Sequence, residues 1–101
     1  MKKGYWVNAY RSVSDESAVK AYSALAVPAI LAYGGRFLTN SASQVEANES
    51  GLKQRTIIVE FDSYEIALAA RKSEGYQKAL AALGSGADRD SRIVEGMDQQ
   101  G

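Results

Sequence analysis

Two glutamates and one arginine are the residues in this sequence best suited to acid–base chemistry. Glu60 and Glu95 each lie in a segment with strand character, and alternation along the two strands predicts that both carboxylates reach one covered face. A glutamate enclosed there could act as a general base, with Arg36 as its counter-charge or as the anchor for a substrate. Alternatively, the two carboxylates could pair with Arg36, Arg55 or Arg92 across a subunit interface and fix its register.

A ligand pocket is expected beside these glutamates. Trp6 and Asn8 belong to the first predicted strand, and Tyr22 and Tyr76 to two predicted helices. With Arg36 they form the candidate ligand-binding set, in which the aromatic rings would be the pocket walls. The alternative for Tyr22 is plain core packing, because it lies in an apolar helical stripe.

The composition excludes several classes of chemistry and of partner. The sequence has no cysteine and no histidine, so we expect no metal site and no cofactor held by imidazole or thiolate. Twelve basic and twelve acidic residues balance, so no nucleic-acid partner is expected. No run is long and apolar enough for a membrane span, which predicts a cytoplasmic protein forming one domain over residues 1–101. The segment Asp88-Arg89-Asp90 is interpreted as a solvated turn rather than a cation site.

The first half of the chain predicts a strand, a helix and a tight reversal. Residues 4–11 mix aromatic and β-branched side chains, which is typical of a strand, and Ser14 and Asp15 offer a helix N-cap. Apolar residues then recur at helical spacing as far as Tyr33, although Pro28 predicts a kink or break near residues 25–27. Gly34 and Gly35 end this helix, because glycine adopts the left-handed conformation that a helix terminus requires.

The second half predicts more strands around a second helix. Residues 36–39 form a strand, 44–49 a weak edge segment, and 55–61 the central strand. A capping box at Asp62 and Glu65 opens the helix, which Gly75 interrupts and Gly84 ends before a last strand over 91–97.

This order is the β-α-β-β-α-β arrangement of an α+β, ferredoxin-like fold, with two helices on one face of an antiparallel sheet. The other face would be uncovered. We assign Trp6, Tyr10, Ile58 and Ile93 to it, and an apolar patch of that size predicts a second copy of the chain as its cover.

Several motifs together resemble the domain of unknown function 1330 family. They are Lys3-Gly4-Tyr5-Trp6, the run from Tyr33 to Leu38, the run from Val59 to Ala67, the run from Ser73 to Gln77, and Ile93-Val94-Glu95-Gly96. The resemblance covers nearly the whole chain. It implies a dimeric α/β barrel, in a superfamily that includes cofactor-free monooxygenases, haem-degrading enzymes and lactone isomerases, and it implies no particular reaction.

Two kinds of function remain open at this stage. The first is a homodimer with a small-molecule pocket, either between sheet and helices or at the dimer interface, which could be a cofactor-free monooxygenase-like or isomerase-like enzyme. The second is a non-catalytic dimerisation or structural module. A closed, dry interface would favour the module, whereas an open pocket containing a carboxylate would favour ligand chemistry.

Overall fold

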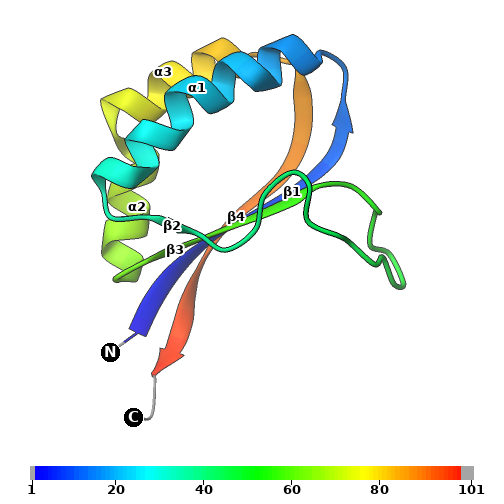
Figure 1. Ribbon diagram of the computed structural model, residues 1–101. Helices are drawn as coiled ribbons and strands as arrows, with labels where there is room; N and C mark the ends of the chain where they lie inside the picture. The colour runs from blue at the N-terminus through cyan, green and yellow to red at the C-terminus, as the bar shows by residue number, and fades with distance from the viewer. Residues whose placement is uncertain (1, 99–101) are drawn as a thin grey trace.

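A four-stranded antiparallel sheet carries three helices on one of its faces, as the computed structural model shows for residues 2–98 (Figure 1). In chain order the elements are β1 (Lys2–Val13), α1 (Glu16–Ala32), β2 (Arg36–Phe37), β3 (Thr56–Phe61), α2 (Tyr64–Lys72), α3 (Glu74–Leu83) and β4 (Ala87–Asp98). The strands lie in the order β2-β3-β1-β4. The predicted α+β, ferredoxin-like fold is therefore confirmed, with the second helix divided into α2 and α3.

Helix α1 begins and ends as the sequence predicts. The Asp15 side chain accepts hydrogen bonds from the backbone N–H groups of Ser17 and Ala18 and from the Ser17 hydroxyl. The Ser17 hydroxyl bond, followed by the backbone bonds, lowers the pKa of Asp15. At the other end Gly34 has φ of +75°, and a Cβ on Gly35 would lie 2.5 Å from Ile30 Cγ2. The two glycines are thus required for different reasons, one for its conformation and one for lack of space.

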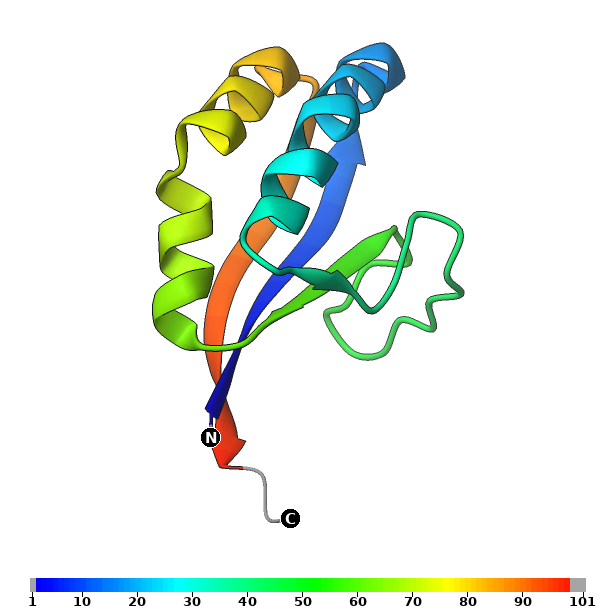
Figure 2. The ribbon, with the colours of Figure 1, turned by 60° about the vertical axis from the view of Figure 1, so that its left-hand side comes forward.

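The break predicted near Pro28 is absent. Helix α1 is continuous from Glu16 to Ala32 (Figure 2). Pro28 and Ala24 are both exposed, so the Ala24 carbonyl, which loses its helical donor at Pro28, can be hydrated. The helix therefore passes through the proline without a break.

Serine side chains set the limits of α2 and α3. Ser63, rather than Asp62, is the N-cap of α2 and accepts a hydrogen bond from the Ile66 N–H. Ser73 ends α2 and caps α3 by accepting from the Tyr76 N–H, so the interruption comes two residues before Gly75. This early turn directs α3 back along α1, and the two helices pack against each other.

The strand register decides which side chains face the helices. Trp6 lies opposite Val59 and Ile93, and Tyr10 lies opposite Arg89, all on the helix-covered side of the sheet. Trp6 is 2% exposed, and its indole N–H donates to the Ala67 carbonyl in α2. The assignment of Trp6, Tyr10 and Ile93 to the uncovered face is therefore wrong. The error is one of parity, since a one-residue shift in alternation moves every side chain to the other face.

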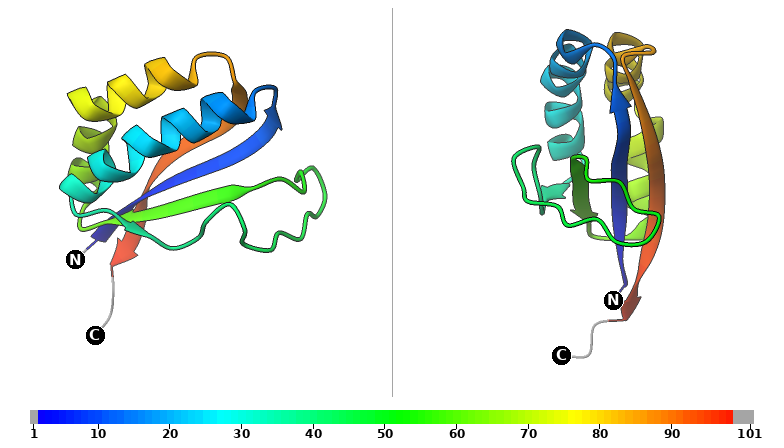
Figure 3. Two further views of the ribbon diagram at one scale, coloured as in Figure 1. Left: turned by 45° about the horizontal axis from the view of Figure 1, so that its top comes forward. Right: turned by 90° about the vertical axis from the view of Figure 1, so that its right-hand side faces the viewer.

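The other face of the sheet has no helix over it (Figure 3). Ile58 does lie there, as expected, because it is paired with Val7 on the side away from Trp6. By the same alternation the apolar residues on this face are Tyr5, Val7, Ala9, Leu38, Ile58 and Val94. Leu38 and Val94 are 53% and 49% exposed, so residues 2–98 leave this face open.

A long loop between β2 and β3 replaces the predicted edge segment at 44–49, which forms no strand. Thr39 anchors its start through its side chain, which donates to the Thr56 carbonyl and accepts from the Ile58 N–H. Arg55 anchors its end, where its carbonyl accepts from the Tyr10 N–H. The loop is therefore anchored to β3 at its start and to β1 at its end.

Both long strands extend beyond their predicted ends. β1 and β4 pair from Lys2 with Asp98 to Val13 with Ala87, with a register shift between Tyr10 and Ser12. Residues 88–90 therefore belong to β4 and not to a turn. None of the helices in residues 2–98 has the length and apolar character needed to span a bilayer.

Candidate ligand-binding site

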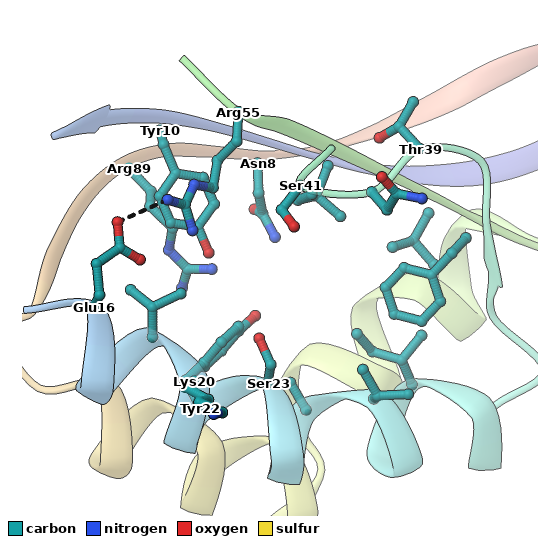
Figure 4. A pocket seen from close by; sticks show the side chains of 18 residues that line it. Asn8, Tyr10, Glu16, Lys20, Tyr22, Ser23, Thr39, Ser41, Arg55 and Arg89 are labelled. Atoms are coloured by element: carbon teal, nitrogen blue, oxygen red, sulfur yellow. Dashed lines mark hydrogen bonds and ion pairs between the residues drawn. The ribbon is translucent and has the colours of Figure 1, made fainter. Parts of the chain in front are cut away.

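A cavity of about 570 Å³ lies between α1 and the helix-facing side of the sheet (Figure 4). Its wall comes from β1, α1, β2, β3, β4 and both ends of the long loop. The lining side chains are Asn8, Tyr10, Glu16, Val19, Lys20, Tyr22, Ser23, Ala26, Val27, Ile30, Phe37, Thr39, Asn40, Ser41, Arg55, Ile57, Val59 and Arg89. The size falls within the usual range for small-molecule sites.

The cavity is charged at one end and apolar at the other. Tyr10 and Arg89 lie near the tip of the sheet, opposite Lys20 in the second turn of α1. Trp6, four residues before Tyr10 in β1, lies opposite Val59. Near this point apolar side chains from the last turns of α1, from β2 and from β3 line the cavity. Helix α1 runs antiparallel to β1, so its first turns lie at the charged end of the cavity and its last turns at the apolar end (Figure 4).

Two arginines lie against Tyr10 at the charged end. The Cζ atoms of Arg55 and Arg89 are 5.4 and 5.5 Å from the centre of its ring. Arg55 is also paired with Glu16, at 2.9 Å between Nη2 and Oε2, as the dashed line in Figure 4 shows. The Arg89 Cζ lies 4.7 Å from the Tyr22 ring centre, and its Nη1 is buried without a hydrogen-bond partner among residues 2–98.

Tyr22 is held in place from behind by α3. Its hydroxyl lies 2.7 Å from that of Tyr76, and the Tyr76 ring packs edge-on against Trp6. Burial raises the pKa of Tyr22, and the neighbouring Tyr76 raises it further. The Tyr22 phenol is therefore neutral at physiological pH and serves as a hydrogen-bonding group rather than a base.

Asn8 completes the polar part of the floor. It is 4% exposed, and its Oδ1 accepts a hydrogen bond from the Ser91 hydroxyl at 2.6 Å. This bond fixes the orientation of the Asn8 amide, so that its Nδ2 group points into the cavity (Figure 4).

The two candidate glutamates lie on opposite sides of the sheet, so the enclosure expected to hold both does not exist. Glu60 is opposite Tyr5 on the open face, and Glu95 is opposite Gly4 on the helix-facing side. Glu95 is near the end of β4, where its carboxylate lies 4.0 Å from Lys2 Nζ. Neither glutamate lines the cavity.

Glu60 instead forms an ion pair within its own chain. Arg36 Nε lies 3.0 Å from Glu60 Oε1, and Tyr5 donates its hydroxyl proton to Glu60 Oε2 at 3.1 Å. Arg36 also reaches Asp62, at 3.1 Å. The Arg36 hydrogen bond, followed by that of Tyr5, lowers the pKa of Glu60, which weakens it as a base.

Of the five candidate ligand-binding residues, Asn8 and Tyr22 line the cavity. Trp6 and Tyr76 form the core layer behind it, and Arg36 lies with Glu60 on the open face. The sequence did not point to the other lining residues, among them Tyr10, Lys20, Arg55 and Arg89. Arg89 could have been found only by extending the last strand to residue 87, since alternation then places it beside Tyr10.

The cavity contains little that could bind a metal ion. Within residues 2–98 no group of three acidic side chains is arranged to hold one. The carboxylate that lines the cavity, Glu16, is already paired with Arg55. The arrangement favours binding of a molecule through cationic and hydrogen-bonding groups at one end and apolar contact at the other.

Comparison with known proteins now identifies the family. The profile described as "Domain of unknown function (DUF1330)" matches residues 3–97. The chain belongs to this family. No curated protein matches the sequence significantly.

Solved structures similar to this family member share its fold. A protein of unknown function from Rhodopseudomonas palustris has a TM-score of 0.71 at 18% identity, over 98% of this chain and 84% of that one. A dimeric ferredoxin-like protein of unknown function from Thermobifida fusca has a TM-score of 0.57 at 16% identity, over 92% and 90%. A putative antibiotic biosynthesis monooxygenase from Nitrosomonas europaea also has a TM-score of 0.57, at 15% identity, over 99% and 94%. At these identities the likeness shows the fold alone.

Proposed function

We propose that this protein binds a small organic molecule in the cavity between α1 and the sheet, and that it does so as a homodimer of single-domain subunits spanning residues 1–101. The observation that carries the proposal is the cavity itself, about 570 Å³ with an apolar end and a polar end. Such amphipathic enclosures are typical of ligand sites, since apolar contact supplies affinity and a few polar groups fix orientation.

The homodimer is supported by the open sheet face. Leu38 and Val94 expose apolar surface there, and they flank Val7 and Ile58 on the central strands. The similar structure from Thermobifida fusca is described as dimeric. In the proposed dimer the ligand cavity lies on the far side of the sheet from the partner, so each subunit has a complete site.

Binding, rather than proton abstraction, is the function we favour. Glu60 and Glu95 lie outside the cavity, and the raised pKa of Tyr22 keeps its phenol protonated, so it is not available to accept a proton at neutral pH. A cofactor-free monooxygenase-like or isomerase-like reaction stays a prediction, and of the two only a monooxygenase is named in the description of the Nitrosomonas europaea structure. The cytoplasmic location also stays a prediction, which cell fractionation would test.

The experiment uses two neighbouring small residues on α1. Ser23 is exposed and lines the cavity, whereas Ala24 is exposed and does not. Ser23→Trp should block the cavity and Ala24→Trp should leave it open, while both add the same side chain to the helix surface. A fragment library screened by amide chemical-shift perturbation should give hits on the wild type and on Ala24→Trp, with shifts at cavity residues. Equal hits on Ser23→Trp, or none on any variant, would contradict the proposal.

A further inference from the structure

We propose that the ligand of this cavity is an organic acid, whose carboxylate is bound by Arg89 and whose apolar body fills the opposite end. This inference rests on the proposed function, because it names the chemical class of molecule that the cavity takes.

Arg89 is a cation without a carboxylate partner in residues 2–98. Four other arginines have one: Arg11, Arg36, Arg55 and Arg92. The two aspartates next to Arg89 in sequence cannot serve, because alternation along β4 directs them to the other face. There Asp90 pairs with Arg92 at 2.9 Å, and Asp88 lies 3.9 Å from Arg11.

The fold holds the Arg89 guanidinium in one place without neutralising it. The group lies over the rings of Tyr10 and Tyr22, and the Tyr22 ring is itself fixed by the hydroxyl contact with Tyr76. Its Nη1 is shielded from solvent, and no acceptor within residues 2–98 reaches it. Buried polar groups are ordinarily hydrogen-bonded, and the Arg89 side chain lines the cavity, so its guanidinium has unused donor capacity for an acceptor that arrives with a ligand.

The cavity as a whole carries excess positive charge. Its charged lining consists of Lys20, Arg55 and Arg89 against the single carboxylate of Glu16, which Arg55 already binds. An anion would compensate this charge. A planar carboxylate suits a guanidinium because it can accept two parallel hydrogen bonds.

The rest of the cavity selects an organic anion over a simple one. The wall away from Arg89 includes the apolar side chains of Ile30, Phe37 and Val59, with Thr39 at the same end. Inorganic phosphate or acetate would leave this wall uncovered, whereas an acid with an aryl or alkyl body would bury it.

The test is calorimetry with three probes: 4-phenylbutanoate, its neutral amide 4-phenylbutanamide, and acetate. On the wild type the acid should bind about tenfold or more tightly than the amide, and acetate should bind more weakly than both, because only the acid satisfies both ends of the cavity. Raising the salt concentration should weaken binding of the acid and leave the amide unchanged.

A matched pair of variants locates the anion. Arg89→Gln should reduce acid affinity to the level of the amide. Arg71 is the matched control, because its Cζ also lies over a tyrosine ring, 5.4 Å from the centre of Tyr76. It does not line the cavity, so Arg71→Gln should leave acid affinity unchanged. If Arg89→Gln does not fold, Arg89→Lys keeps the charge without the planar fork and should lose part of the preference for acid.

The outcomes separate this inference from the proposed function. Equal binding of acid and amide by the wild type, independent of salt, would overturn the organic acid while supporting a ligand cavity. Acetate binding as tightly as 4-phenylbutanoate would overturn it in favour of a site for small anions. No binding of any probe at millimolar concentration would overturn both proposals.

Discussion

The hydroxyl oxygens of Tyr22 and Tyr76 lie 2.7 Å apart, and this contact joins the cavity wall on α1 to the core beneath α3. One of the two phenols donates to the other, and both residues are buried. The chemistry of the cavity wall is therefore tied to the stability of the fold.

The burial of Tyr22, and next to it the neighbouring Tyr76, predict a loss of stability at alkaline pH. The pKa of Tyr22 is raised above 10.0 in the folded protein, so the neutral phenol stabilises the fold fully below the unfolded pKa, and this stabilisation is lost as the pH rises toward the folded pKa. Tyr22→Phe should make the urea midpoint less dependent on pH between about pH 8 and pH 11. The exposed Tyr33, at the end of the same helix, provides the control: Tyr33→Phe should behave as the wild type. Identical pH profiles for all three proteins would contradict the prediction.

Removing both hydroxyls of the pair should cost less than the two single removals added together. Tyr76→Phe leaves the Tyr22 hydroxyl buried without its partner, which should destabilise the protein by about 1–2 kcal/mol. In the double variant neither hydroxyl is left unpaired, so the second change adds little to the first. Urea denaturation of the four proteins measures this coupling, and additive costs would show that the contact contributes nothing.

Glu60 should titrate below the ordinary range of a glutamate. The Arg36 hydrogen bond is the main cause of its lowered pKa and the Tyr5 hydroxyl the second. Because the folded pKa is depressed, the stabilisation from Glu60 is present above the unfolded pKa and is lost as the pH falls through the folded value. Carbon-13 NMR of the Glu60 carboxyl should show the low pKa in the wild type, a large rise in Arg36→Gln and a smaller rise in Tyr5→Phe. A Glu60 pKa above that of a free glutamate would contradict the ion pair with Arg36.

The open face predicts that a charge there separates subunits. Val94 is half exposed in a single subunit, so Val94→Asp should leave the subunit folded while placing a charge in the proposed interface. Light scattering after size exclusion should report a dimer for the wild type and a monomer for Val94→Asp. Lys53→Glu, in the exposed loop, should remain dimeric. A monomeric wild type at micromolar concentration would refute the dimer.

The continuous helix predicts that Pro28 costs stability. Pro28→Ala restores one backbone donor in the interior of α1 and should raise the free energy of unfolding by about 1–2 kcal/mol, after allowing for the more flexible unfolded chain. The reverse change at the exposed Ala21, Ala21→Pro, should lower it by about 3 kcal/mol. Chemical denaturation compares the three, and a less stable Pro28→Ala protein would show that the proline is favourable where it stands.

Local patterns in the sequence predicted the fold. The site depended on which face of the sheet each strand residue points to. The N-cap at Asp15, the reversal at Gly34 and Gly35 and the apolar central strand each act over a few residues, and the structure confirms them. The faces of β1 and β4 depend on pairing between distant segments. The register shift between Tyr10 and Ser12 has no local signal, so residues 88–90 looked like a polar turn. That single error removed Arg89 from the candidate site.

The Thr39 side chain, which bonds both Thr56 and Ile58, ties the start of the long loop to β3. With Thr39 and Arg55 fixed, residues 40–54 can be exchanged, lengthened or shortened without breaking a strand pair, and doubling such a loop costs only about 0.6 kcal/mol in closure entropy. The loop over residues 40–54 can therefore be replaced while the cavity residues on the sheet and α1 stay in place. This arrangement suits grafting of new loops to change which molecules enter the cavity.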